Sequence, residues 1–234
     1  MEIAQRAKRS PNGRHGLVRS ASAVFFDFDN TITPINVLDD VIRQFAVDQA
    51  WIPLQEAWEA GVIGSRECLV GQLRSVRVSP ATLTRYLSGV PLDPYFKPLV
   101  TLLKRWRVQP VIVSDNFSSI VNRILRRHGV QRLPVYANRV RLICGRLIPA
   151  FPFARKDCTR GCAHCKQQHL MRRKSRAHPV VYVGDGLSDL CPADVADLVF
   201  AKGVLLRHCR RTGRPCIAFD TLKDVYSFVK EGTR

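Results

Sequence analysis

The chain has 234 residues, of which 46% are hydrophobic and 24% are charged; this is the composition of a globular protein and excludes disorder throughout. Its 37 Lys and Arg residues against 19 Asp and Glu give a net charge of +18, which suits partners that carry phosphate groups. Because the basic residues are scattered, and because no run approaches the ~18 apolar residues of a membrane helix, we expect neither nucleic acid nor a membrane as the main partner.

The N-terminal part of the chain changes character twice. Residues 1–20 are basic and lack hydrophobic periodicity, which predicts a flexible tail and not an export signal. The apolar run AVFFDFD at 23–29 is typical of a buried parallel strand. From 37 to 87 the apolar residues follow helical spacing, and Ser79-Pro80 is a typical helix start. This stretch is therefore predicted to be an all-helical insertion.

Strands and helices alternate after Pro94. The predicted order is helix 96–106, strand 110–115, helix 118–128, strand 133–137, a hairpin turning at Cys144-Gly145, helix 166–176, strand 179–185, then strand, helix, strand and helix to the C-terminus. Such alternation predicts right-handed crossovers onto a mostly parallel sheet. We therefore expect an α/β fold, with a Rossmann-like sheet flanked by helices built from 21–33 and 95–234, and a small helical cap at 34–94.

Three of the predicted strands end in polar residues, and ligands bind outside the carboxyl ends of such strands. Asp27 and Asp29 are two residues apart after the first strand, so they can face one site. Ser114 follows the second of these strands, and Asp185 and Asp189 follow the third. Each motif alone is commonly a turn or a cap, but their order together indicates a site. Because close carboxylates repel, a cation is expected there, and Mg²⁺ suits oxygen ligands.

In this order the segments FFDFDNTIT, VIVSDN, Lys166 and VYVGDGLSD resemble the haloacid dehalogenase superfamily of phosphatases over residues 23–229. The segments DCTRGCAHCK and GDGLSDLCPA are most similar to the group of 2-hydroxy-3-keto-5-methylthiopentenyl-1-phosphate phosphatases of methionine salvage. Phosphocholine/phosphoethanolamine phosphatases and phosphoserine phosphatases are similar too.

The resemblance implies a Mg²⁺-dependent phosphomonoester phosphatase that forms an aspartyl-phosphate intermediate. It implies that Asp27 is the nucleophile and that Asp29 is the general acid and base. It assigns the phosphoryl group to Thr31, Ser114, Asn116 and Lys166. It assigns the metal to Asp27, the backbone carbonyl of Asp29 and Asp185, with Asp189 supporting these ligands.

The chain departs from the family pattern at two places. Asn30 stands where many relatives have glycine, and asparagine tolerates left-handed backbone angles fairly well. The segment Ser114-Asp115-Asn116 replaces the Ser-Gly-Gly of the methionine-salvage and phosphoserine enzymes, which puts an acid and an amide near the phosphate. Lys156 competes with Lys166 as the phosphate-binding lysine. We prefer Lys166, because it opens the helix that leads to the Gly-Asp-Gly strand.

Three cysteines form the second signal. Cys158, Cys162 and Cys165, with His164 or His169 as the fourth ligand, could close a tetrahedral structural Zn²⁺ site. The alternative is a cysteine-rich loop beside the active site. The other five cysteines are scattered, which is typical of reduced thiols in a cytoplasmic protein.

The sequence therefore predicts a cytoplasmic, Mg²⁺-dependent phosphatase whose partner is a small phosphorylated metabolite. The methionine-salvage phosphate is the favoured substrate, and phosphocholine, phosphoethanolamine and phosphoserine are the alternatives. The cap residues Asp39, Arg43, Trp51 and Trp58 are candidates for substrate contacts, although tryptophans at helical spacing are more often core. The non-enzymatic alternative is a basic nucleic-acid-binding or zinc-dependent interaction protein on a degenerate phosphatase frame.

Overall fold

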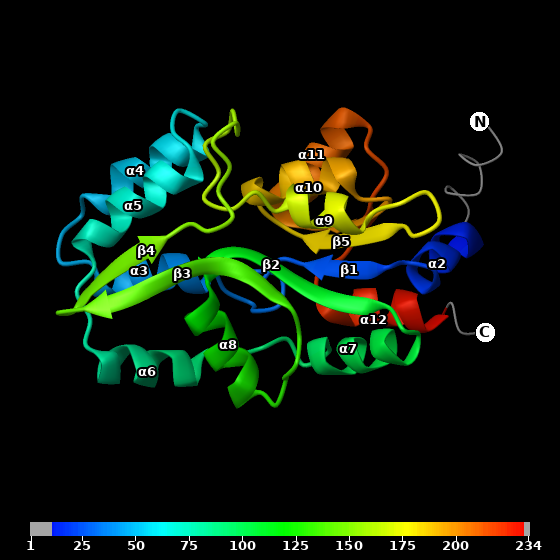
Figure 1. The fold of residues 1–234 in the computed structure, drawn as a ribbon, viewed down its shortest axis with the longest axis horizontal. Helices are drawn as coiled ribbons and strands as arrows, with labels where there is room; N and C mark the ends of the chain where they lie inside the picture. The colour runs from blue at the N-terminus through cyan, green and yellow to red at the C-terminus, as the bar shows by residue number, and fades with distance from the viewer. Residues whose placement is uncertain (1–10, 232–234) are drawn as a thin grey trace. The chain divides into compact units, whose positions relative to one another are not determined.

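A computed structural model describes residues 11–231 of the chain. The strands of this part form one sheet in the order β4-β3-β2-β1-β5-β6-β7. Figure 1 labels β1 to β5. The strands are β1 (Ala23–Phe26), β2 (Gln109–Phe117), β3 (Val135–Ile143), β4 (Arg146–Ala150), β5 (Val180–Gly184), β6 (Leu198–Ala201) and β7 (Ile217–Ala218). All described pairings are parallel except that of β3 with β4. The predicted α/β class, with a mostly parallel sheet and flanking helices, is confirmed.

The described part of the chain folds as two compact units. The first unit holds residues 11–27, 93–112 and 167–231, and the second holds 28–92 and 113–166. The division passes through the segment that follows β1 and through the middle of β2.

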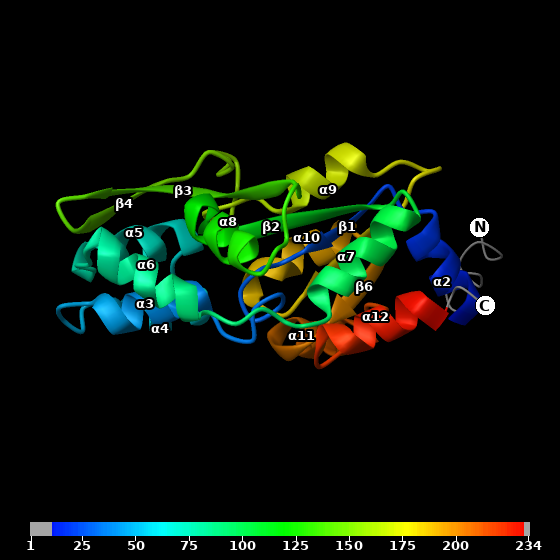
Figure 2. The same cartoon turned by 90° about the horizontal axis from the view of Figure 1, so that it is seen from below.

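The first unit contains the buried parallel strands. Phe25 of β1 pairs with Val111 on one side and with Tyr182 on the other, and all three are fully buried. The helices of this unit are α2 (Pro11–Arg19), α7 (Phe96–Arg105), α9 (Gln167–Arg173), α10 (Leu190–Val195), α11 (Gly203–Thr212) and α12 (Leu222–Glu231). Helices α7 and α12 lie side by side (Figure 2). Strand β1 is apolar throughout because it is covered on both faces.

The prediction of a flexible tail over residues 1–20 was wrong for residues 11–19, which form helix α2. Val18 in this helix is 1% exposed, and the ring of His15 stacks on Phe228 at a centroid distance of 4.0 Å. These tertiary contacts stabilise a short segment whose own periodicity is weak. Residues 1–10 lie outside the described part of the chain.

The second unit contains the helical insertion and a β-hairpin. Its helices are α3 (Val37–Phe45), α4 (Trp51–Glu59), α5 (Ser65–Ser75), α6 (Pro80–Gly89) and α8 (Ser118–Arg127). Ser79 caps α6 by accepting a hydrogen bond from the backbone N–H of Thr82, with Pro80 in the first turn, as predicted. The hairpin turns at Cys144-Gly145, also as predicted, with positive φ at both residues.

Two details of the second unit differ from the sequence-based expectation. The strand expected at 133–137 and the first arm of the hairpin are one continuous strand, β3. Helix α4 has no fully buried residue, so Trp51 and Trp58 are only half-buried and are not core residues.

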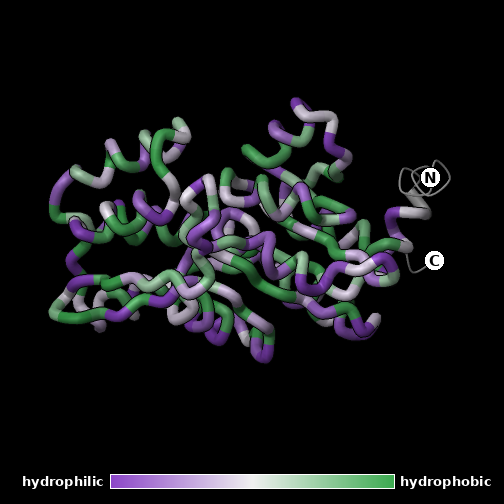
Figure 3. Tube along the Cα trace, turned by 45° about the horizontal axis from the view of Figure 1, so that its top comes forward, coloured by the Kyte–Doolittle hydropathy of each residue, from purple (hydrophilic) through white to green (hydrophobic). Residues whose placement is uncertain are grey.

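Figure 3 shows hydrophilic and hydrophobic positions alternating along the chain's helices, as expected for elements with one covered face. None of the described helices is long and apolar enough to cross a membrane.

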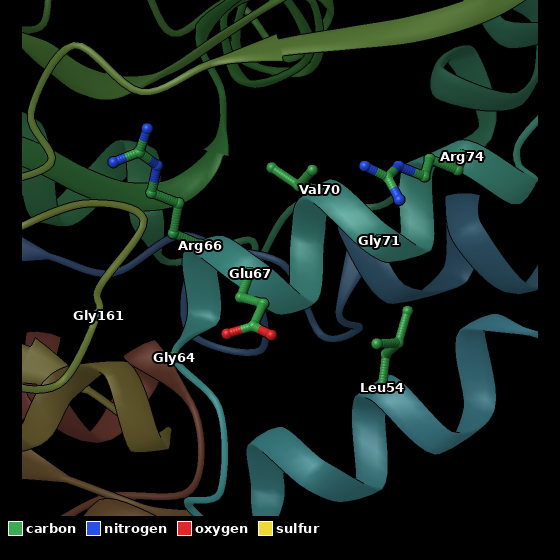
Figure 4. Close-up of a pocket in the computed structure, with 8 residues that line it drawn as sticks. All are labelled: Leu54, Gly64, Arg66, Glu67, Val70, Gly71, Arg74 and Gly161. Atoms are coloured by element: carbon green, nitrogen blue, oxygen red, sulfur yellow. The ribbon is translucent and has the colours of Figure 1, made fainter.

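Gly64 marks a close approach between two backbone segments of the second unit. A Cβ built on Gly64 would lie only 2.7 Å from the backbone carbonyl carbon and Cα of Gly161, so a side chain requires the backbone to move (Figure 4). We expect Gly64→Ala to lower the free energy of unfolding by about 1–3 kcal/mol, measured by urea denaturation. Gly89 is the matched control, because a Cβ there meets nothing within 4 Å. Gly89→Ala should be neutral or stabilise by up to about 1 kcal/mol, and equal losses in both variants would contradict the argument.

Candidate active site

Three carboxylates meet in the first unit. Asp27 follows β1, Asp185 follows β5, and Asp189 ends a short 3₁₀ turn (Leu187–Asp189). One ligand oxygen from each lies within 4.8 Å of the others. Asp27 and Asp189 are buried and Asp185 is half-buried, so this is a concentration of negative charge with little access to solvent. The predicted convergence of the first and third strand ends is therefore observed.

The loop after β5 is built around Asp189. One oxygen of its carboxylate, Oδ2, accepts hydrogen bonds from the backbone N–H groups of Asp185 at 2.8 Å and Gly186 at 2.9 Å. The other oxygen accepts a 2.6 Å hydrogen bond from the hydroxyl of Tyr182. A Cβ on Gly184 would lie 2.8 Å from the Asp189 carboxyl carbon, so only glycine fits there. Asp189 thus holds the loop that carries Asp185.

Tyr182 is a site residue that the sequence analysis missed. Burial and the nearby negative charges of Asp189 and Asp27 raise the pKa of Tyr182 well above its usual value, so its hydroxyl stays protonated and donates. The available signal was a tyrosine inside an otherwise aliphatic buried strand, because a buried tyrosine hydroxyl needs a partner.

The donor set of this acidic cluster fits a hard divalent cation. All three ligand atoms are carboxylate oxygens, and Mg²⁺ binds proteins through one or two carboxylates while retaining water and substrate ligands. A cation would also offset the repulsion between the three charges. Among the described residues, no other group of His, Cys, Asp and Glu side chains forms such a cluster.

A second group of polar side chains lies in the second unit around Asp29. The side-chain amide of Asn116 donates to both carboxylate oxygens of Asp29, at 3.0 and 3.1 Å. The backbone N–H of Val37, at the start of α3, donates to the same carboxylate at 2.8 Å. Burial raises the pKa of Asp29 to about 7, although the hydrogen bonds from Asn116 and Val37 lower it. The positive charge of Lys166 also lowers the pKa of Asp29.

The loop after Asp29 turns at Asn30. Asn30 has a φ of +54°, which is the left-handed conformation expected for this position. Its backbone N–H donates to the carbonyl of Ile35 at 3.0 Å and closes the loop. Thr31 follows and is 2% exposed.

Ser114 and Lys166 are both buried in the second unit, with exposed fractions of 0% and 2%. The hydroxyl of Ser114 accepts a hydrogen bond from the backbone N–H of Asn116 at 3.0 Å. Lys156, the competing lysine, is exposed.

The zinc hypothesis for the cysteine segment is not supported. The ligand atoms of Cys158, Cys162, Cys165 and His164 do not form a metal-holding cluster in the part of the chain that the structure describes. Nδ1 of His164 instead lies 2.9 Å from the carbonyl oxygen of Ser114, and its ring stacks on Phe153. Through Nδ1, His164 therefore contacts the backbone at Ser114.

The eight catalytic and binding residues predicted from the sequence thus fall into two groups. Asp27, Asp185 and Asp189 lie in the first unit, and Asp29, Thr31, Ser114, Asn116 and Lys166 lie in the second. Only Phe28 separates Asp27 from Asp29, so the backbones of these two residues lie no more than about 7 Å apart.

A separate pocket of about 500 Å³ in the second unit contains none of these residues. It lies beside α4 and α5 and is lined by Leu54, Gly64, Arg66, Glu67, Val70, Gly71, Arg74 and Gly161 (Figure 4).

Asp39 on α3 provides a pH-dependent stability test. Burial, with the charge of Glu59, raises its pKa to about 6, above the ~3.9 of an unfolded aspartate. The folded state therefore binds the proton more tightly, and stability is lost as pH rises from about 4 to about 6. Between pH 4 and pH 8 the free energy of unfolding of the parent protein should fall by on the order of 2 kcal/mol more than that of the Asp39→Asn variant. The exposed Asp194 is the control, and an Asp194→Asn variant with the same effect would contradict the prediction.

Comparisons with known proteins identify relatives of this chain. The chain is 26% identical to a 2-hydroxy-3-keto-5-methylthiopentenyl-1-phosphate phosphatase of Brevibacillus brevis over 89% of this chain and 95% of that protein. It is 26% identical to the phosphoserine phosphatase of Bos taurus over 80% of this chain and 84% of that protein.

A solved structure described as a phospho-aspartyl intermediate analogue of phosphoserine phosphatase shares the fold. Its TM-score is 0.69 at 18% identity, covering 90% of this chain and 99% of that chain. A family model described as Putative Phosphatase matches residues 22–203, most of the chain. The chain therefore belongs to this phosphatase family of the haloacid dehalogenase superfamily and is a phosphoric monoester hydrolase.

Proposed function

We propose that the chain is a Mg²⁺-dependent phosphatase that hydrolyses a small phosphorylated metabolite through an aspartyl-phosphate intermediate. The observation that carries this proposal is the approach of Asp27, Asp185 and Asp189 to within 4.8 Å. Bound there, Mg²⁺ would neutralise developing charge on the phosphoryl oxygens. Asp27 and Asp185 would hold the ion, and Asp189 would support them by fixing the loop that carries Asp185.

The two carboxylates on either side of Phe28 would have different roles. Asp27 would be the nucleophile, and Asp29 would be the general acid and base. A carboxylate oxygen of Asp27 attacks phosphorus, the bond from phosphorus to the leaving oxygen breaks, and Asp29 gives that oxygen its proton. Asp29 then removes a proton from water, which attacks the phosphorus of the intermediate and releases inorganic phosphate and the Asp27 carboxylate. A pKa of about 7 suits Asp29 to both proton transfers near neutral pH.

Thr31, Ser114 and Lys166 would bind the transferring phosphoryl group, as donors placed where charge develops. We assign Asn116 a different contribution from the phosphate contact expected from the sequence. Its amide N–H groups reach Asp29, and its amide oxygen accepts from the backbone N–H of Phe117 at 2.6 Å. Asn116 would therefore position the carboxylate of Asp29.

Lys166 and Lys156 form a matched pair for testing the phosphate site. We expect Lys166→Ala to lower kcat/KM by about 10²-fold or more, as for removal of one positioned donor to the reacting phosphoryl group. Lys156→Ala should stay within about twofold, because the Lys156 side chain is exposed and water screens its charge. Steady-state hydrolysis of p-nitrophenyl phosphate measures both variants. A larger loss in the Lys156 variant would reverse the assignment.

Residues 34–94, which include helices α3 to α6, would form the cap. The cap would supply the contacts that select the substrate. The methionine-salvage phosphate is the first candidate substrate, because the Brevibacillus brevis relative acts on it and is matched over 95% of its length. Phosphoserine is the second, because the phosphoserine phosphatase of Bos taurus is equally identical, although over less of the chain. Asp39 and Arg43 of α3 are the cap residues that we propose for substrate contact.

One assay tests the proposed function. Inorganic phosphate release is measured with Mg²⁺ on p-nitrophenyl phosphate, the methionine-salvage phosphate, phosphoserine, phosphocholine and phosphoethanolamine. We expect activity on the first compound and the highest kcat/KM on one of the four metabolites. Equal, near-zero rates with Mg²⁺, with EDTA and in Asp27→Asn would refute the enzyme and favour a binding protein on this frame.

We also propose the cytoplasm as the location of the protein. All eight cysteines are free thiols in the structure, and reducing compartments maintain that state. Fractionation of the producing cells, with the protein detected by antibody, tests this, and recovery from a secreted fraction would contradict it.

A further inference from the structure

Two pairs of cysteine side chains are in contact in this chain. In the second unit, the thiol of Cys162 is hydrogen-bonded to the sulfur of Cys158. In the first unit, Cys216 is hydrogen-bonded to Cys209 in the same way. Each pair has free thiols that are near enough to interact, but their surroundings differ.

The first pair sits on a tight turn. The backbone N–H of Gly161 donates to the carbonyl of Cys158 at 3.1 Å, and Gly161 has a φ of +59°. This turn brings Cys162 back toward Cys158 and aims the backbone N–H groups of Arg160 and Cys162 at the Cys158 sulfur. Both cysteines are half-buried, so small molecules in solution can reach them.

The surroundings of Cys158 favour its thiolate. Burial by itself would raise the pKa of Cys158, but the backbone N–H groups and the thiol of Cys162 outweigh it and lower the pKa. The nearby guanidinium of Arg155 is paired with Asp157, so the donors from the turn itself account for this shift. Hydrogen-bond donors that stabilise a thiolate are a usual feature of a reactive cysteine.

The second pair has the opposite environment. Cys209 lies on α11 and is 0% exposed. Burial and the neighbouring Cys216 raise the pKa of Cys209 to about 11. Cys216 is half-buried, but its partner Cys209 has neither exposure nor thiolate character, so this pair serves as the internal comparison.

We propose that Cys158 and Cys162 are a peroxide-reactive dithiol that closes to an intramolecular disulfide. The Cys158 thiol first releases its proton to solvent, and the thiolate attacks one oxygen of hydrogen peroxide; an S–O bond forms, the O–O bond breaks, and the departing hydroxide takes up that proton from solvent as water. The Cys162 sulfur, losing its proton, then attacks the sulfenic sulfur; the S–S bond forms, the S–O bond breaks, and water leaves. The two thiols are oxidised by two electrons and the peroxide is reduced to water.

The other candidate metal ligands do not converge on this pair. Among the described residues, Cys165 and His164 do not join Cys158 and Cys162 in a metal-holding cluster. A contact between two sulfurs, one with thiolate character, is the arrangement from which a disulfide forms.

The test is made on the full, reduced protein. It is treated with hydrogen peroxide, remaining thiols are blocked with iodoacetamide, and peptides are mapped by mass spectrometry. We expect a loss of two hydrogens that links Cys158 to Cys162, reversed by dithiothreitol, before any link between Cys209 and Cys216. In the untreated protein at pH 7, iodoacetamide should modify Cys158 at least tenfold faster than Cys209.

Two variants separate the chemistry from a change in folding. Cys162→Ser should leave a sulfenic acid on Cys158 that dimedone traps, and Cys158→Ser should abolish peroxide reaction at Cys162. Cys144→Ser, which removes an exposed cysteine outside both pairs, should leave the link unchanged. The proposal is overturned if the Cys209–Cys216 link forms first, if peroxide yields no Cys158–Cys162 link, or if stoichiometric zinc uptake protects Cys158, Cys162 and Cys165.

Discussion

Replacing Asp27 with Asn is expected to reduce kcat for p-nitrophenyl phosphate by about 10⁴-fold or more, as for removal of an enzyme nucleophile. The amide keeps the size of the side chain but lacks the charged oxygen that must bond to phosphorus. Steady-state kinetics gives the loss. Acid quenching during turnover should trap a phosphoenzyme in the parent protein, labile to hydroxylamine, and none in the variant. A variant that retains a tenth of the activity would rule out Asp27 as the nucleophile.

Stability serves as the control for this substitution. Asp27 shares its surroundings with the negative charges of Asp185 and Asp189, so removing one charge relieves repulsion in the metal-free protein. The backbone hydrogen bond from Asp27 to the carbonyl of Val183, 2.9 Å long, does not involve the side chain. The metal-free variant should therefore melt at the same temperature as the parent or higher. A lower Tm would mean that lost folding explains the lost activity.

Removal of divalent metal is the second change with a large expected effect. EDTA should lower the hydrolysis rate by at least about 10³-fold, because a cation at the transferring phosphoryl group is worth several kcal/mol. Adding Mg²⁺ in excess should restore the rate. Ca²⁺, which prefers more ligands at longer distances, should restore little of it. Full activity in EDTA would contradict the metal assignment.

A binding measurement locates the ion independently of turnover. Saturating Mg²⁺ at about 100 times its Kd should stabilise the folded protein by about 2.7 kcal/mol, seen as a rise in Tm. Asp185→Asn should greatly reduce this rise. Asp194→Asn should keep it, because Asp194 is exposed, outside the acidic cluster, and 3.7 Å from Arg214. Equal rises in all three proteins would place the ion elsewhere.

The sequence predicted the sheet and the acidic cluster because both depend on local patterns. Apolar runs such as AVFF at β1 can be stable only when buried on both faces, and polar residues directly after such runs must lie at the carboxyl edge. Chain direction then brings Asp27 and Asp185 together, since β1 and β5 are parallel neighbours. The left-handed Asn30 was predictable for the same reason, because few residue types other than glycine adopt that conformation easily.

The remaining features depend on contacts between distant segments. Helix α2 was missed because Val18 and His15 gain their partners only in the folded chain. The zinc hypothesis is not supported, because spacing along a loop does not show which side chains converge, and the cysteines and His164 form no metal-holding cluster among the described residues. Likewise, the sequence does not show that the amide of Asn116 donates to Asp29, a residue 87 positions earlier in the chain.

The hydrogen bonds of Asp189 have a consequence for how the ion binds. Its carboxylate is already fixed by the hydroxyl of Tyr182 and by two backbone N–H groups before a cation arrives. The conformational entropy of ordering this loop is therefore lost during folding and not during association, which makes the site preorganised. Tyr182→Phe should then weaken Mg²⁺ affinity through a more variable loop, although the tyrosine hydroxyl is a neutral donor and not a ligand. An aromatic side chain in the centre of the sheet would in this way set the affinity for an ion that it does not touch.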